Sequence, residues 1–382
     1  MTSGAIEQLI HAAGENSLPI SVTFQVTDRC NYDCVHCYQE HEDKDELSTA
    51  EVIDILEQLA EAGVLYLTLM GGELFMRRDA NDIIKKAHEL GFALRVFSTG
   101  HHIHDKRADF LAEMKPLQVE LSLYGSKPAI HEKITNHKGS WQRTRDAAER
   151  LLKRGVAVIL KSPLTSENVD DIDSLAALAE DLGAEWTFDP KLRAMENGDK
   201  KPLSLRANQR DLKSFYGDKV GQSIAKVFKG FEKGKEAKPL HAKPCGVGQK
   251  ACAITPKGKV WPCNSLPIEV GDLRKQRFAE IWTQSKSLEE IRDLRWADIS
   301  ECNKCKLREF CQRCHAMASL EHGKMKGPSL EACRHAVVVR DTLKAQGLVP
   351  SEHNDLPPTW SRVDLDGNHG ISKTNKALKV IA

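Results

Sequence analysis

Six short apolar runs alternate with helical patterns between residues 20 and 190. The runs have the length and the aliphatic or aromatic content of buried strands. They are Ile20–Gln25, Leu65–Met70, Ala93–Ser98, Gln118–Ser122, Val156–Lys161 and Glu185–Phe188. The clearest helical pattern opens with Ser48 and Glu51, which have the spacing of a capping box before an amphipathic stretch. The other helical patterns cover Ala80–Leu90, Lys106–Met114, Trp141–Arg154 and Val169–Leu182.

This series of strand–helix units predicts an α/β fold with a parallel sheet and helices outside it. Because the alternation stops near residue 190, we expect a partial (β/α)6 TIM-like barrel rather than a complete eightfold one. In such folds the loops at the carboxyl ends of the strands carry the chemistry. Polar residues that follow these six strands are therefore the first candidates for a functional site.

The rest of the sequence divides into segments of different composition. We expect an N-terminal extension over residues 1–19, the barrel core over 20–190, a connector over 191–242, a cysteine-rich domain over 243–343 and a polar tail over 344–382. The connector is charged, with one or two helices predicted around Ser223–Lys233.

Charge and hydropathy exclude several classes of partner. The chain has 55 basic and 54 acidic residues and a formal net charge of +1, so nothing indicates nucleic-acid binding. No apolar run is long enough for a membrane helix, and no signal peptide is evident, so we expect a cytoplasmic protein without a membrane partner. In a reducing compartment, 11 cysteines in two groups indicate metal ligands rather than disulfides.

The first cysteine group follows the first predicted strand directly. Cys30, Cys34 and Cys37 have the spacing C-x3-C-x2-C. Three thiolates on one short loop can hold three irons of a [4Fe–4S] cluster and leave the fourth iron open to another ligand. A zinc site with His36 as a fourth ligand is the alternative.

With the strand ends that follow, this group resembles the radical S-adenosylmethionine (SAM) superfamily. By that resemblance, Tyr38 lies near the adenine of SAM, and the turn of Gly71, Gly72 and Glu73 binds its amino group, although Leu74 replaces the usual proline. Further contacts to SAM are expected from Ser98, which precedes Thr99-Gly100, from Ser122 in Ser-Leu-Tyr-Gly, and from Lys161, a candidate partner for the SAM carboxylate.

The other eight cysteines lie between residues 245 and 333 and resemble the SPASM domain, a C-terminal extension of many radical SAM enzymes. By that resemblance, two auxiliary [4Fe–4S] clusters are bound. The first is held by Cys245, Cys252, Cys263 and Cys314, and the second by Cys302, Cys305, Cys311 and Cys333. One departure is the two-residue gap before Cys314, where three residues are common. A zinc ribbon of Cys302, Cys305, Cys311 and Cys314 is the alternative.

The resemblance implies reductive cleavage of SAM to a 5′-deoxyadenosyl radical, which abstracts hydrogen from a peptide or protein substrate. We expect a maturase of ribosomal peptide natural products that forms a crosslink or oxidises a residue. Alternatives are tetrapyrrole or haem d1 modification, a non-catalytic iron–sulfur electron carrier, and sulfatase maturation, which Asn264 disfavours because relatives carry aspartate there. Expected partners are a reductant such as flavodoxin or ferredoxin and a separate leader-recognition protein, since few residues precede Cys30.

Overall fold

The computed structural model describes residues 3–42, 44–217 and 238–350. The chain forms two compact units. Unit 1 comprises Met1–Pro163, Asp170–Asp189 and Gly246–Asp293, and unit 2 comprises Leu164–Val169, Pro190–Cys245 and Leu294–Ala382. The helices predicted around Ser223–Lys233 and most of the polar tail lie outside the described residues. Each helix of the described residues is too short or too polar to cross a lipid bilayer.

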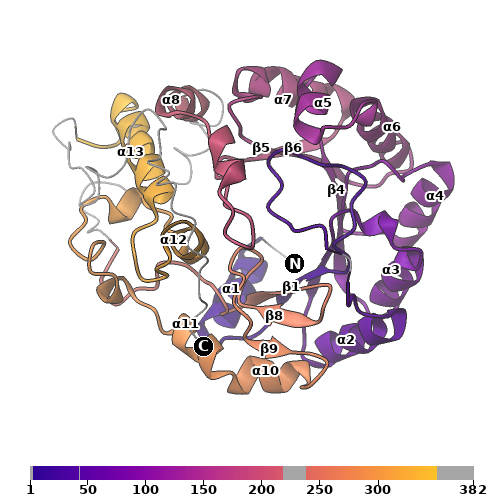
Figure 1. Cartoon of the computed structure of the whole chain (residues 1–382), viewed down its shortest axis with the longest axis horizontal. Helices are drawn as coiled ribbons and strands as arrows, with labels where there is room; N and C mark the ends of the chain where they lie inside the picture. Colours follow the sequence, from indigo (N-terminus) through magenta and orange to yellow (C-terminus); the bar gives the residue numbers. More distant parts are fainter. Residues whose placement is uncertain (1–2, 43, 218–237, 351–382) are drawn as a thin grey trace. The chain divides into compact units, whose positions relative to one another are not determined.

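All six predicted strands are present in unit 1 and pair in parallel, in the order of the sequence. They are β1 (Ser21–Gln25), β2 (Tyr66–Met70), β3 (Ala93–Ser98), β4 (Gln118–Ser122), β5 (Val158–Pro163) and β6 (Glu185–Asp189). Helices lie outside these strands, as Figure 1 shows for unit 1. They are α2 (Thr49–Glu61), α3 (Ala80–Glu89), α4 (Asp105–Met114), α5 (Pro128–Thr135), α6 (Ser140–Leu152) and α7 (Ile172–Leu182).

Local sequence explains where these elements begin and end. The capping box is formed, because the Ser48 hydroxyl accepts from the amide of Glu51 and the Glu51 carboxylate accepts from the amide of Ser48. Strand β5 begins two residues later than predicted, because the Val156 amide still closes the end of α6 by donating to the Leu151 carbonyl. Helix α7 likewise starts after a 3-10 turn over Val169–Asp171.

The sheet of unit 1 is longer than predicted. It has nine strands, in the order β6-β5-β4-β3-β2-β1-β7-β8-β9. Strand β7 (Ala251–Ile254) is parallel to β1, and β8 (Lys259–Trp261) and β9 (Gly271–Asp272) continue it in antiparallel fashion. Two short helices, α10 (Phe278–Gln284) and α11 (Lys286–Arg292), complete this region. Part of the cysteine-rich segment therefore extends the sheet of the barrel.

The sequence analysis predicted neither α10 and α11 nor the helices that follow here. Helix α1 (Ser3–Glu15) precedes β1, and α5 follows β4 in unit 1. Unit 2 contains α8 (Gln209–Gly217), α12 (His315–His322) and α13 (Leu330–Ala345), together with the 3-10 turns Lys201–Leu205, Trp296–Asp298 and Arg308–Phe310. Helices α8 and α13 pack against each other within this unit.

Candidate SAM and iron–sulfur sites

The cysteine loop that follows β1 is held against the turn that follows β2. The amides of Gly72 and Glu73 donate to the carbonyls of Thr27 and Arg29 at 2.9 and 2.8 Å. A Cβ at Gly71 would lie 2.7 Å from the Thr27 carbonyl oxygen, and one at Gly72 would lie 2.6 Å from that of Arg29. Only glycine allows this approach, so Gly71 and Gly72 fix Glu73 beside the segment that leads into Cys30.

Glu73 is a buried carboxylate surrounded by neutral donors. It is 1% exposed and accepts from the Phe75 amide at 3.0 Å, the Ser98 hydroxyl at 2.9 Å, and both the amide and the hydroxyl of Thr99 at 2.6 Å. Among the described residues, no lysine, arginine or histidine forms an ion pair with it. The structure thus brings Ser98 to Glu73, and it adds Thr99, which the sequence analysis had quoted only as part of a motif.

The three thiols of the loop lie close to one another. The Tyr32 amide donates to Cys30 Sγ at 3.4 Å, and the Cys37 amide donates to the Cys34 carbonyl at 3.0 Å. Burial raises the pKa of Cys30 to about 11, and burial together with the neighbouring Cys37 and Cys30 raises the pKa of Cys34 well above its usual value. Binding of iron favours the thiolate form, which burial of these thiols disfavours. The donor set fits a cluster that takes three protein thiolates.

His36, in the same loop, contacts Tyr124, which lies just after the end of β4. Its ring meets Tyr124 edge-on at 4.7 Å, and Tyr124 stacks on His131 at 5.4 Å. The Nδ1 atom of His36 is buried without a hydrogen-bond partner. Tyr38, the predicted adenine contact, is half-buried after Cys37. Sequence analysis had treated His36 only as a zinc ligand, and its spacing before Cys37 gave no signal of this contact.

His41 is a second residue that the sequence analysis missed. Its Nδ1 lies 3.0 Å from the Asp28 carbonyl oxygen, and its ring also hydrogen-bonds Cys37. Hydrogen bonds to a ligating sulfur orient it and tune the bound metal. No spacing rule in the sequence links His41 to Cys37, so only the fold reveals the contact.

The other two predicted SAM contacts lie on neighbouring strands. Ser122 and Lys161 are paired in the register of β4 and β5, and Ser122 hydrogen-bonds Tyr124. Lys161 does not end its strand, because β5 continues to Pro163. Its ammonium lies 3.0 Å from the Glu120 carboxylate and 4.2 Å from the centre of the Phe97 ring. A SAM carboxylate would have to compete with Glu120 for Lys161.

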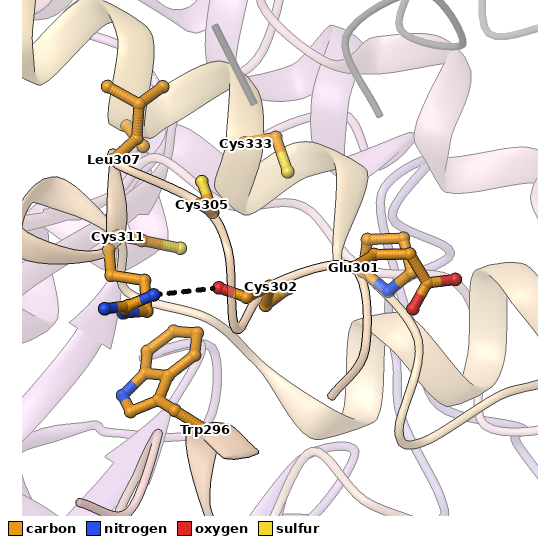
Figure 2. A pocket seen from close by; sticks show the side chains of 10 residues that line it. Trp296, Glu301, Cys302, Cys305, Leu307, Cys311 and Cys333 are labelled. Carbon is orange, nitrogen blue, oxygen red and sulfur yellow. Dashed lines mark hydrogen bonds between the residues drawn. The ribbon is translucent and has the colours of Figure 1, made fainter. Parts of the chain in front are cut away.

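Four cysteines surround one pocket of unit 2, shown in Figure 2. They are Cys302, Cys305, Cys311 and Cys333, the set predicted for the second auxiliary cluster, and Trp296 and Leu307 supply apolar walls. Burial raises the pKa of Cys302 to about 11 and that of Cys311 to about 12. Four thiols with an apolar surround fit a cluster with four thiolate ligands.

Basic groups lie around this pocket. Arg308 Nη1 donates to the Cys302 carbonyl at 3.4 Å, and Lys238 Nζ donates to the Cys311 carbonyl at 2.9 Å. Lys191 Nζ lies 2.9 Å from Oε1 of Gln312, the residue after Cys311. These three cations outnumber Glu301, the one carboxylate among the lining residues, and favour an anionic occupant of the pocket.

The first predicted auxiliary set is divided between the two units: Cys245 and Cys314 belong to unit 2, and Cys252 and Cys263 belong to unit 1. In the described part of the chain, no three His, Cys, Asp or Glu side chains converge as tightly as a single metal ion requires. A four-iron cluster does not need such convergence, because each thiolate binds a different iron.

Comparison with known families now identifies the chain. A model of the radical SAM superfamily matches residues 24–179, which span β1 to α7 and include the cysteine loop and Glu73. The chain is a radical SAM enzyme. A second model, of an iron–sulfur cluster-binding domain, SPASM, matches residues 245–315. The chain therefore belongs to the radical SAM enzymes with a SPASM domain, which bind SAM at a [4Fe–4S] cluster and carry auxiliary clusters.

Individual relatives extend these matches over most of the chain. It is 26% identical over 357 residues to a PqqA peptide cyclase of Xanthomonas oryzae pv. oryzae, covering 87% of this chain and 93% of the relative. It is 24% identical over 332 residues to an AdoMet-dependent heme synthase of Methanosarcina barkeri, covering 78% and 92%. The structure of Streptococcus suis SuiB bound to its precursor peptide SuiA has a TM-score of 0.65 at 15% identity, covering 86% of this chain and 79% of SuiB, and this likeness shows the fold alone.

Proposed function

We propose that this enzyme modifies a peptide substrate, forming a crosslink or oxidising a residue during maturation of a ribosomal peptide natural product. One observation carries the proposal: the similarity to a PqqA peptide cyclase runs over nearly the full length of both chains. This similarity therefore extends beyond the segments that match the radical SAM and SPASM models.

In this proposal Cys30, Cys34 and Cys37 hold the SAM cluster, and Glu73 receives the ammonium group of SAM. When bound, the cluster and SAM supply a 5′-deoxyadenosyl radical that abstracts hydrogen from the substrate. Two of the donors on Glu73 are the hydroxyls of Ser98 and Thr99. A hydroxyl can rotate and become an acceptor, so these groups can make room for an ammonium without leaving a buried donor unpaired. Gly71 and Gly72 hold Glu73 at the cluster loop.

The remaining site residues are proposed in supporting roles. Tyr38 contacts the adenine, Ser122 contacts SAM, and Lys161 takes the SAM carboxylate in exchange for Glu120. Cys302, Cys305, Cys311 and Cys333 hold one auxiliary cluster, and this is supported by their shared pocket. Cys245, Cys252, Cys263 and Cys314 are assigned to the other by resemblance. A flavodoxin or ferredoxin in the cytoplasm supplies electrons, and a separate protein presents the leader of the peptide.

The test is deuterium transfer from a candidate substrate. The protein is reconstituted anaerobically and incubated with SAM, dithionite and a perdeuterated peptide encoded by a short reading frame beside its gene. We expect deuterium in 5′-deoxyadenosine and a changed peptide mass. Formation of 5′-deoxyadenosine without deuterium, together with an unchanged peptide, would contradict the proposal.

Tetrapyrrole modification is the second candidate, favoured by the similarity to an AdoMet-dependent heme synthase. The same assay distinguishes it when a deuterated haem precursor replaces the peptide. Deuterium transfer from the tetrapyrrole, and none from the peptide, would establish this candidate and reject the first. The Cys34→Ala variant is the control in both arms, because it should not generate the radical.

A further inference from the structure

Arg313 stands between two cysteines that the proposed ligand sets assign to different clusters. Cys311 belongs to the set of the second auxiliary cluster and Cys314 to that of the first, with only Gln312 and Arg313 between them. The Arg313 side chain is 2% exposed. The short gap between Cys311 and Cys314 thus places a buried guanidinium next to a ligand of each cluster.

Hydrogen bonds fix the plane of this guanidinium but do not use all of its donors. Nη1 lies 2.6 Å from His315 Nδ1, which accepts, and Nη2 donates to the carbonyls of Met325 and Gly327. The Nε donor is buried without a hydrogen-bond partner. Among the described residues, no carboxylate forms an ion pair with Arg313. A fixed, buried cation with a spare N–H and no carboxylate is missing an anion.

The anions available to Arg313 are the cysteines. The thiols of Cys302, Cys311, Cys245 and Cys314 are near enough for their charges to act on the guanidinium, and Cys302 also hydrogen-bonds it. Burial lowers the pKa of Arg313, and these four groups oppose that effect. When the cysteines bind iron, they become thiolates of clusters with a net negative charge. The clusters would then supply the counter-ion that no carboxylate of the described residues provides.

We propose that Arg313 is a positioning residue shared by the two auxiliary clusters, and that its buried charge raises the reduction potentials of both. One-electron reduction adds a negative charge to a cluster, so a fixed cation beside the thiolates stabilises the reduced form. A hydrogen bond to a ligating sulfur acts in the same direction. The inference rests on the proposed assignment of the eight C-terminal cysteines.

The test uses full-length protein with Cys30, Cys34 and Cys37 changed to alanine, so that only the auxiliary clusters remain. We predict about eight irons per chain in this parent and in its Arg313→Gln and Arg313→Lys derivatives. A redox titration followed by EPR should show both midpoint potentials lowered by Arg313→Gln. The expected loss is about tenfold in each reduction equilibrium, which corresponds to about 59 mV for a one-electron couple. Arg313→Lys keeps the charge without the planar fork and should shift both potentials less.

Arg308→Gln is the matched control. Its guanidinium donates to the carbonyls of Cys302, Asn303 and Lys238, and its side chain lines the pocket of the second set. We therefore expect this variant to move one potential and leave the other in place.

Unchanged potentials in Arg313→Gln, or a shift of only one, would overturn the inference. If Arg313→Gln loses iron, Arg313→Lys decides, because it keeps the charge: both potentials should then fall by less than about 59 mV, and a full tenfold loss in either reduction equilibrium would contradict a charge effect. A parent that holds far fewer than eight irons would instead refute the ligand sets, so the two failures are distinguishable.

Discussion

The site beside the cysteine loop in unit 1 and the cysteine region of unit 2 each contain a buried charge without an ion-pair partner among the described residues. The charge is negative in unit 1 and positive in unit 2. In unit 1, the hydrogen-bond donors to the buried Glu73 carboxylate are all neutral among the described residues, and Arg107 acts on it through its charge without forming an ion pair. In unit 2, Arg313 is a buried guanidinium without a carboxylate partner among the described residues, and Arg308 and Lys238 lie nearby. A buried charge needs a counter-ion, so the first site suits a cationic ligand such as the ammonium of SAM. The second suits anionic clusters.

The two sites also differ in how the chain supplies their cysteines. In unit 1 the three thiols lie on one loop whose position is set by β1 and by the glycines after β2. In unit 2 the four thiols of the pocket extend from Cys302 to Cys333 in α13, so the pocket depends on tertiary packing. We therefore expect the first site to retain its activity, the cleavage of SAM, when the second site is damaged.

The largest expected effect separates the two kinds of cluster. Cys34→Ala should abolish 5′-deoxyadenosine formation, because a SAM cluster with two thiolate ligands is not retained. The Cys30/Cys34/Cys37 triple alanine variant should lower iron from about twelve to about eight per chain. Cys333→Ala should keep measurable SAM cleavage, because its thiol lies in the other unit. Iron and sulfide analysis with quantification of 5′-deoxyadenosine checks all three predictions. Normal SAM cleavage by Cys34→Ala would contradict the assignment of that reaction to the three-cysteine loop.

The second effect concerns how unit 2 balances its buried charges. Arg206 forms ion pairs with Glu321 at 2.6 Å and Glu331 at 3.7 Å, and Arg334 pairs with Glu331 at 2.7 Å. Glu331→Gln leaves these arginines short of an anion and should lower the free energy of unfolding by about 3–5 kcal/mol. The control is Glu57→Gln in unit 1, whose pair with Lys86 is partly exposed, so its loss should cost less than about 1 kcal/mol.

The pH dependence of the free energy of unfolding tests the same ion pairs independently. Burial alone would raise the pKa of Glu331, but Arg206, His335 and Arg334 outweigh it and hold that pKa well below its usual range. A carboxylate with a depressed pKa contributes stability above its unfolded pKa of about 4.3, and this contribution is lost as the pH falls. Thermal unfolding should therefore show a steeper loss of stability below about pH 5 in the wild type than in Glu331→Gln. Parallel curves would contradict this account.

Sequence analysis predicted the barrel strands because most are short apolar runs between turn residues; β6 is the exception, with no buried residue. It missed α5 because Pro128–Thr135 lacks a strong apolar stripe, and it missed the link between β7 and β1 because such pairing is non-local. Cysteine spacing placed the three-cysteine loop and suggested the pocket set. Spacing could not reveal that Thr99 binds Glu73, that His36 meets Tyr124 or that Lys161 is held by Glu120, since all three contacts depend on which loops the fold brings together.

The third effect tests whether the Glu73 carboxylate in unit 1 binds a cationic group of SAM. Glu73→Gln keeps the size of the side chain but removes its charge, so it should weaken SAM binding by about 2–3 kcal/mol, roughly 30- to 150-fold. Ser98→Ala removes one neutral donor and should cost about tenfold or less. The KM for SAM in 5′-deoxyadenosine formation measures both, with iron content verifying that the cluster is retained. Equal effects of the two variants would contradict an ionic role for Glu73.

The smallest effect decides which ligand Lys161 serves. Its ammonium is partly exposed and bound to Glu120, so a contact with the SAM carboxylate is worth only about 1 kcal/mol. Lys161→Met should therefore raise the KM for SAM about fivefold. Glu120→Gln should lower it, because the variant frees Lys161 from its competing carboxylate. If both changes leave the KM for SAM unaltered but weaken peptide modification, the Lys161–Glu120 pair contacts the substrate, and the cationic ligand of unit 1 is recognised through Glu73 without help from Lys161.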